Sequence, residues 1–169
     1  SDSNIIWPDR QMMIFSRDVL KDNPGASIIY DVKCSRNLHK WIIEYGGCPI
    51  MWKTGHSFMK SKLKETGASL AGEMSGHIFF NDNWFGFDDA IYAGARLLSI
   101  LADEENITSF FRELPDSFCT PEIKLKIEGF SAGDILNRLK NKKLFPRAKH
   151  FYFLDGIRIE YEDGFGLAR

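Results

Sequence analysis

The sequence has little cysteine, no long hydrophobic run and no excess of either charge. Its three cysteines, Cys34, Cys48 and Cys119, form no CxxC pair and have no zinc-like spacing to histidine. We therefore expect reduced, buried thiols rather than a disulfide framework or a zinc site. No apolar stretch approaches the length of a membrane span, and the N-terminal residues lack the basic and hydrophobic regions of a secretory signal. These absences exclude a membrane partner and favour the cytoplasm.

Charge and composition narrow the class of protein further. The 22 basic and 23 acidic residues nearly balance, and no basic stripe is present, which argues against a nucleic-acid partner. Histidines and aspartates at 56, 77, 88 and 89 show no HxxxH, HExxH or DxD spacing, so we predict no metal site. With 44% hydrophobic residues the chain can fill a core, and 169 residues suffice for one ordinary domain plus a fragment, or for two small domains.

The first part of the chain alternates helical and strand periodicity, which is typical of a layered α/β unit. The expected strands are 27–32, 49–52, 69–72 and 77–80. The expected helices begin at Pro8, after the cap Ser35, at Ser57, after Asp88 or Asp89, and near Thr108. We expect an inward face in two of these helices at Phe58, Met59 and Leu63, and at Ile91, Leu98 and Leu101.

The pattern changes after a proline-bracketed boundary at 115–121. Residues 122–128 alternate as a strand, 132–140 form a helix, and Asp155-Gly156 predicts a type I′ hairpin between 151–154 and 157–161. The apolar run 165–168 then stops at Arg169. We predict an α/β fold, a layered mixed sheet with flanking helices in residues 1–116, followed by a truncated α+β domain with antiparallel strands in residues 117–169.

Three polar clusters follow successive expected strands of the α/β unit. They are Asp31 with Lys33, the run 53–56 and the run 72–75, and all three are expected at the carboxyl edge of the sheet, where such folds bind ligands. Lys33 suits a phosphate, with a solvated surface lysine as the equal alternative. Gly55 lets the backbone approach a ligand closely and His56 can donate a hydrogen bond to it, with a helix-start turn as the less favoured alternative.

The run Gly72-Glu73-Met74-Ser75-Gly76-His77 carries the most specific chemistry. A carboxylate at 73 accepts hydrogen bonds from two vicinal sugar hydroxyls, and the serine hydroxyl can donate or accept beside it. The methionine suits packing. By residue type alone, a histidine that enters an apolar strand, as His77 does, is more often a hydrogen-bonded core residue than a catalyst. Only its place beside the glutamate favours a functional role.

Several stretches of the chain, in order, resemble the bacterial phosphomannomutase/phosphoglucomutase branch of the α-D-phosphohexomutase family, from its third domain into the start of the fourth. The stretches are 7–10, 31–34, 51–56, 64–67, 72–77, 84–89 and 155–156. Met74 favours this branch over the phosphoglucosamine mutases, which remain an alternative. The resemblance implies the interconversion of hexose 1-phosphate and hexose 6-phosphate, mannose or glucose, through a bisphosphorylated sugar such as glucose 1,6-bisphosphate.

The resemblance also implies roles for individual residues. Glu73 and Ser75 would hold sugar hydroxyls O3 and O4, with Met74 and Gly76 in the same recognition loop. Lys33, His56 and Arg10 would contact phosphate or sugar oxygens, and His77 and Lys33 would assist the reacting phosphoryl group, for which positioning and charge stabilisation suffice. Arg169 would open a phosphate-binding loop.

Two motifs of the family do not occur in this sequence, the active-site phosphoserine and the aspartate-rich Mg²⁺ loop. The resemblance therefore implies that the Mg²⁺ ligands lie outside this chain, in the missing domains, which would be its partners alongside the hexose phosphates. We expect the chain to be inactive alone and to bind no cofactor itself. A sugar-phosphate-binding module without catalysis is the second hypothesis, and neither the preferred sugar nor the oligomeric state follows from the sequence.

Overall fold

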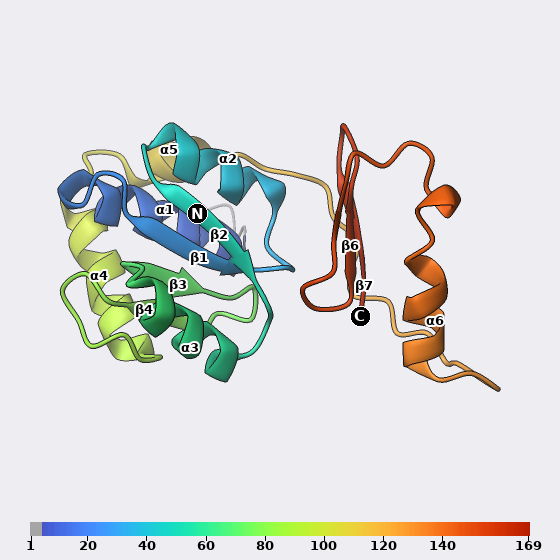
Figure 1. The fold of residues 1–169 in the computed structure, drawn as a ribbon. Helices are drawn as coiled ribbons and strands as arrows, with labels where there is room; N and C mark the ends of the chain where they lie inside the picture. Colours follow the sequence, from blue (N-terminus) through green and yellow to red (C-terminus); the bar gives the residue numbers. More distant parts are fainter. Residues whose placement is uncertain (1–4) are drawn as a thin grey trace. The chain divides into compact units, whose positions relative to one another are not determined.

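The computed structural model describes residues 5–169, which divide into two compact units, one ending at Ser117 and one spanning Phe118–Arg169 (Figure 1). The first unit alternates helices and strands along the chain, as the periodicity predicts. Its elements are α1 (Pro8–Asp22), β1 (Ser27–Asp31), α2 (Arg36–Glu44), β2 (Cys48–Trp52), α3 (His56–Thr66), β3 (Leu70–Gly72), β4 (Ile78–Phe80), α4 (Ala90–Ala102) and α5 (Ile107–Arg112).

A mixed four-stranded sheet of order β2-β1-β3-β4 forms the centre of this unit. Strands β2 and β3 flank β1 in parallel, with Ile29 opposite both Ile50 and Ala71. Strand β4 runs antiparallel to β3, so Leu70 faces Phe80. The predicted α/β class with a layered mixed sheet is thereby confirmed.

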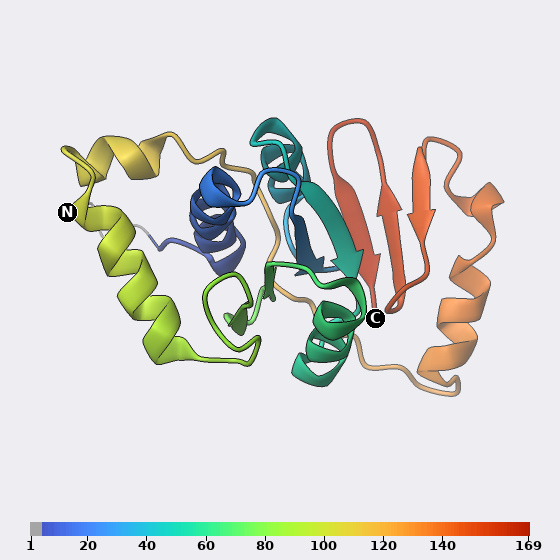
Figure 2. The same ribbon diagram turned by 60° about the vertical axis from the view of Figure 1, so that its left-hand side comes forward.

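Successive side chains of β1 point to opposite faces of the sheet and meet different helices. Ile28 and Tyr30 pack with α1 and α2, whereas Ile29 packs with Met59 and Leu63 of α3. Figures 1 and 2 show α1 and α3 on opposite sides of the sheet. The result is a three-layer unit whose central sheet is covered on both faces.

The helix boundaries follow the signals in the sequence. Helix α1 begins with a proline, where the absent N–H costs nothing. The Ser35 side chain accepts from Asn37 N at the start of α2. Asp89, rather than Asp88, caps α4, where its carboxylate accepts from the backbone N–H groups of residues 91 and 92.

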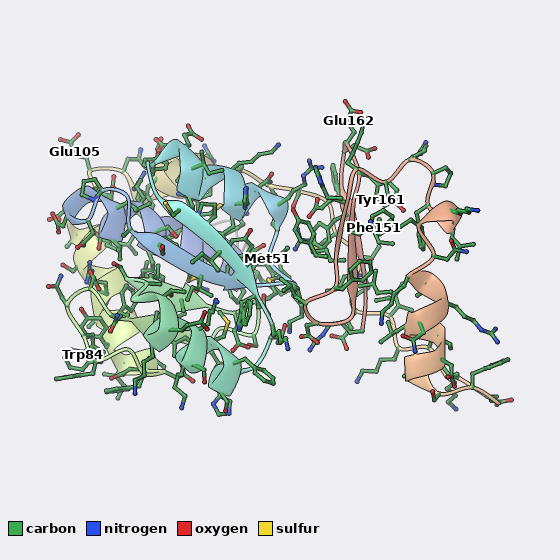
Figure 3. The ribbon with its side chains drawn as sticks, viewed as in Figure 1. Met51, Trp84, Glu105, Phe151, Tyr161 and Glu162 are labelled. Carbon is green, nitrogen blue, oxygen red and sulfur yellow. The ribbon has the colours of Figure 1, made fainter. Side chains whose placement is uncertain are left out.

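One face of α4 differs from the prediction. Leu101 packs against the core as expected, but Ile91 and Leu98 are 86% and 70% exposed, while Ala93 and Ile100 are buried. The helix is rotated because Tyr92, one residue further along, stacks on Trp84 at 4.4 Å between ring centroids. Trp84 is labelled beside α4 in Figure 3. The inward prediction for Phe58 of α3 is also wrong, since this side chain is 53% exposed.

The second unit contains α6 (Ala132–Leu139), a 3₁₀ turn (Lys142–Leu144) and the antiparallel sheet of β5 (His150–Tyr152), β6 (Ile157–Glu160) and β7 (Phe165–Ala168). Ser131 and Asp134 form a reciprocal capping box that starts α6. Ile157 and Ile159 supply the buried apolar side chains of the central strand. The predicted helix and antiparallel strands are therefore confirmed in this unit.

Two local predictions for the second unit are wrong. Residues 122–128 form no strand in the described part of the chain, and Ile123 and Leu125 are 69% and 79% exposed, because no neighbouring strand pairs with them. The hairpin exists, but Tyr152 pairs with Arg158, so residues 153–157 make a longer connection than a two-residue type I′ turn. Gly156 instead lies tightly against the backbone of residue 168.

The prediction of reduced, buried thiols is only partly right. All three cysteines are free, but only Cys34 is buried, while Cys48 begins an edge strand and Cys119 lies in the segment after the first unit, both exposed. Within residues 5–169, no helix is both long and apolar enough to cross a membrane.

Candidate functional site at the carboxyl edge of the sheet

Three loops emerge together at the carboxyl ends of β1, β2 and β3. The strands are parallel neighbours, so Asp31, the residues after Trp52 and the residues after Gly72 all leave the same edge. The backbone of Gly72 lies close to α1, since a Cβ on it would lie 2.2 Å from the Met12 sulfur and would force that side chain to move. The close approach of α1 places the β3 loop beside the start of that helix.

The Asp31 carboxylate connects the three loops. It is fully buried, and it accepts hydrogen bonds from its own loop and from both neighbouring loops. The donors are Lys33 N at 3.3 Å, Cys34 Sγ at 3.1 Å, Thr54 Oγ1 at 2.9 Å and Met74 N at 3.2 Å. A buried carboxylate with donors on both oxygens is a structural anchor.

Burial, with a contribution from the Asp31 charge, raises the pKa of the Cys34 thiol.

Glu73 lies at the end of β3 with 2% of its surface exposed. Its Oε2 accepts from Gly55 N at 3.2 Å and from Ser75 Oγ at 3.3 Å. Its Oε1 is buried and has no hydrogen-bond partner among residues 5–169. Gly55 adopts φ of 128°, a backbone conformation that favours glycine, and precedes the first turn of α3. The carboxylate therefore points toward the α3 N-terminus and keeps one unused acceptor atom.

The loop from 73 to 77 closes on itself and carries exposed polar groups. Glu73 N donates to the His77 carbonyl at 2.9 Å, and Gly76 N donates to the Glu73 carbonyl at 2.9 Å. Gly76 has φ of 94° and lies next to Pro8 of α1. Met74 packs against the apolar core, while Ser75 remains exposed. The packing role expected for Met74 from its residue type is thus what the structure has.

Two histidines lie side by side at this edge. The rings of His56, at the start of α3, and His77 have centroids 6.2 Å apart. His77 Nδ1 lies 2.6 Å from Asp88 Oδ2, and both side chains are partly exposed. The structure therefore brings His56, Glu73, Ser75 and His77 together around the first turn of α3.

The remaining site residues from the sequence occupy other positions. The Arg10 side chain, only 16% exposed, donates to Leu114 O at 3.0 Å and lies 3.7 Å from Asp116, so it braces the end of the first unit. Lys33 is partly buried in the loop that Asp31 holds. Arg169 belongs to the second unit and pairs with Asp155 at 2.8 Å.

Two residues of this edge received less weight from the sequence than from the structure. The sequence singles out Asp31 as one member of a polar cluster, and Asp88 as a possible helix cap and as part of a metal site that the spacing excludes, but gives neither a role at this edge. The adjacent pair of aspartates was the available signal, because a single cap uses one carboxylate and leaves the other for a different partner. No group of three or more histidines, cysteines or carboxylates suited to a metal ion occurs within residues 5–169.

This architecture defines an α/β domain whose polar groups collect at the carboxyl edge of a mixed sheet. Residues 7–118 match the family described as phosphoglucomutase/phosphomannomutase, alpha/beta/alpha domain III, and the chain belongs to this family.

Curated relatives agree with this assignment. A phosphoglucomutase of Neisseria meningitidis is 53% identical over 99% of this chain, and a phosphomannomutase/phosphoglucomutase of Pseudomonas aeruginosa is 50% identical over 98% of it. A crystal structure of a phosphoglucomutase/phosphomannomutase family protein from Burkholderia thailandensis is 54% identical, covers 99% of the chain and superimposes with a TM-score of 0.93.

The chain spans only part of these relatives. It corresponds to 37% of the Neisseria protein, 36% of the Pseudomonas protein and 35% of the Burkholderia chain. The fold and the family therefore do not establish the activity or the substrates of a whole enzyme for this chain, and we treat both as proposals.

Proposed function

We propose that this chain is the sugar-recognition part of a phosphohexomutase that interconverts the 1- and 6-phosphates of glucose or mannose. The observation that carries the proposal is the Glu73 carboxylate, which is held through Oε2 while Oε1 has no partner within residues 5–169. An unpartnered buried acceptor is costly for stability, so its retention suits a role in binding.

The chemistry of Glu73 matches a hydroxylated ring. A carboxylate offers about four acceptor sites on its two oxygens, and only two donors use them here. Vicinal hydroxyls O3 and O4 of a hexose are a pair of donors at the spacing of one carboxylate, and Ser75 Oγ supplies a further polar contact. These contacts involve only the ring, which would let one loop hold the sugar phosphate in either orientation.

Cationic and histidine groups around the loop suit the phosphate. The first turn of α3 presents backbone N–H groups beside His56, and a helix N-terminus favours anions. Lys33, in the loop fixed by Asp31, adds a mobile ammonium. We assign His56, Lys33 and Arg10 to phosphate or sugar oxygens and His77 to the region of the reacting phosphoryl group, with Lys33 as a second catalytic group.

Access to Glu73 sets a requirement on the loop. Because Oε1 is buried, a sugar hydroxyl reaches it only after a local rearrangement, for which we propose the exposed residues 75–77 of the same loop. The positive φ at Gly76 places the most adaptable backbone of the loop at this point. Binding should therefore reorganise the loop locally, without movement of the sheet.

The rest of the enzyme would supply what this chain lacks. We assign residues 1–116 to the third domain of the mutase and 117–169 to the start of the fourth, with Arg169 at its phosphate-binding loop. A phosphorylated serine and a Mg²⁺ site would come from other domains, because the sequence motifs that the resemblance associates with them do not occur in this chain. The chain alone should not isomerise glucose 1-phosphate in a coupled assay. Turnover by the purified chain would contradict the assignment of the catalytic groups to other domains.

The test of the site is a titration with glucose 1-phosphate followed by amide chemical shifts. We expect shifts confined to residues 72–77 and 54–56, the loops that hold Glu73. Glu73→Gln should weaken binding by about tenfold to a hundredfold, because a charge-assisted hydrogen bond contributes about 1.5–3 kcal/mol. The matched control is Glu44→Gln, which removes an exposed carboxylate at the end of α2 and should leave the affinity unchanged.

The proposal is rejected if the chain does not bind glucose 1-phosphate, and two further results would also reject it. The first is a set of ligand shifts that maps elsewhere in the chain while the 72–77 loop stays silent. The second is equal affinity of the wild type and Glu73→Gln with both proteins folded, since the carboxylate would then make no contact with the sugar. Mannose 1-phosphate in a parallel titration compares the two sugars.

A further inference from the structure

Asp88 is held in place from several sides. Its backbone forms an antiparallel bridge with Phe79 of β4, and the next residue donates from its N–H to the Ile78 carbonyl. Its Oδ1 accepts from Ile78 N at 3.3 Å, and its Oδ2 lies 2.6 Å from His77 Nδ1. The carboxylate therefore bridges the backbone of β4 and the imidazole that precedes this strand.

This contact determines which ring nitrogen of His77 carries the proton. An ionised carboxylate can only accept, so a hydrogen bond at 2.6 Å requires Nδ1 to be the donor. In the neutral imidazole Nε2 is then unprotonated and acts as an acceptor. In serine proteases a buried carboxylate likewise holds the catalytic histidine in one tautomer and orientation.

Helix capping does not account for this aspartate. Asp89 caps α4, with its carboxylate on Ile91 N and Tyr92 N and on the Trp84 indole. The Asp88 side chain is directed instead to His77, whose own side chain is 46% exposed. His77 is thus both oriented by a fixed partner and accessible to a ligand.

We propose that Asp88 is a positioning residue that holds His77 in the Nδ1–H tautomer, so that Nε2 accepts a hydrogen bond from a hydroxyl of the bound hexose phosphate. The proposal rests on the proposed function for the ligand and on the Asp88–His77 contact for the tautomer. His56, with its ring centroid 6.2 Å from that of His77, is the neighbouring titratable group at this edge.

The experiment is ¹⁵N NMR of the histidine ring nitrogens in the chain, at a pH at which the ring ¹⁵N shifts themselves identify neutral imidazoles. The wild type should show His77 protonated on Nδ1. Asp88→Asn should switch the proton to Nε2, because an amide oxygen that accepts from Ile78 N leaves the amide NH₂ facing Nδ1. A purely structural role for Asp88 would not move the tautomer.

The matched control is Asp103→Asn, which removes an exposed carboxylate at the C-cap of α4. This substitution should leave the His77 tautomer unchanged. Amide spectra of both variants establish that they are folded. A wild-type His77 protonated on Nε2, or a tautomer that stays the same in Asp88→Asn, overturns the positioning role.

Addition of glucose 1-phosphate separates this role from the proposed function. In the wild type the His77 Nε2 resonance should move as it accepts a hydrogen bond, and in Asp88→Asn it should lose that response. If the tautomers are as expected but glucose 1-phosphate binds without moving Nε2, the use of this nitrogen toward the sugar is wrong. If the chain does not bind glucose 1-phosphate at all, the proposed function fails, while the tautomer measured without ligand still reports on Asp88.

Discussion

The ends of β1 and β3 each carry a buried carboxylate, and the two differ in how completely they are hydrogen-bonded. Asp31 has donors on both oxygens, drawn from its own loop and from the two loops on either side. Glu73, with almost the same burial, has donors on one oxygen only. The first is complete in the folded chain, and the second keeps capacity for a ligand.

A third buried carboxylate limits how far this difference can be taken. Asp82 also has an unpartnered oxygen, but its other oxygen pairs with Arg96 at 2.9 Å. Arg96 bonds Asp18 and the Tyr92 hydroxyl as well, so the pair joins α1, α4 and the loop after β4. An unused acceptor alone therefore does not distinguish Glu73 from Asp82, and the proposed binding role of Glu73 rests also on its place at the carboxyl edge of the sheet.

The largest expected effect on stability comes from replacing the carboxylates of Asp31 and Glu73, one at a time, by amides. Asp31→Asn should lower the free energy of unfolding by about 4 kcal/mol, because the three donors on Oδ1 would lose a charged acceptor and meet a neutral amide oxygen, while the new NH₂ would face only the Thr54 hydroxyl. Glu73→Gln should change it by about 1 kcal/mol or less, since an amide oxygen can still accept from Gly55 N. Urea unfolding followed by tryptophan fluorescence measures both, and it reports on the first unit because all four tryptophans lie in it.

Equal losses of stability in the two variants would remove the distinction between the carboxylates. A large loss in Glu73→Gln alone would reverse it and make Glu73 the structural anchor. Thr54→Val offers a finer check, since it deletes one donor to Asp31 and should cost about 1 kcal/mol.

A smaller loss is expected from Arg96→Met. The substitution keeps an apolar side chain over Phe80 but removes the cationic partner of the Asp82 carboxylate, which is 1% exposed. The free energy of unfolding should therefore fall by about 3 kcal/mol. The same fluorescence-detected urea unfolding measures it. Arg147→Met, at an exposed position of the second unit, should leave the transition unchanged. No loss at residue 96 would mean that the Asp82 pair contributes nothing to the fold.

The smallest expected effect is the pH dependence due to Cys34, whose Sγ is one of the donors to Asp31. Its pKa is raised in the folded state, above the ordinary thiol value of about 8.5 in the unfolded chain. The stabilisation is therefore complete below about pH 8.5 and is lost as pH rises toward the folded pKa, by up to about 1.4 kcal/mol per pH unit.

Cys34→Ser isolates this contribution. A hydroxyl can donate to Asp31 as the thiol does, but it does not titrate in this range. The difference in unfolding free energy between the wild type and the variant should shrink or reverse between about pH 8 and pH 10. A difference that is independent of pH would show that the thiol does not titrate differently in the two states.

Most of the first unit could be predicted from the sequence, because strong apolar periodicity and clear caps coincide there. The strands at 27–32 and 49–52 and the helix that Ser35 begins are examples. The polar runs after these strands were correctly placed at one edge, since parallel neighbours end together. The roles predicted for individual site residues stay predictions until a ligand is bound.

The failures arise where tertiary contacts outweigh local pattern. Alternation at 122–128 satisfies a strand pattern, but a strand also needs a partner, and no sequence pattern supplies one. In α4 the stacking of Tyr92 on Trp84 decides which face turns inward, and both faces carry apolar residues. The contact of the Arg10 guanidinium with the Leu114 carbonyl likewise joins distant parts of the chain, and no local pattern predicts it.

The shared carboxylate of Asp31 has a consequence for ligand affinity. Because one group ties three loops together, most of their conformational entropy is lost during folding, and a ligand need not order them again. The short stretch 75–77 is exposed and has no such anchor of its own among the hydrogen bonds to Asp31. If the proposed function holds, substitutions in that stretch should alter the affinity for a ligand while the frame beneath it keeps its stability.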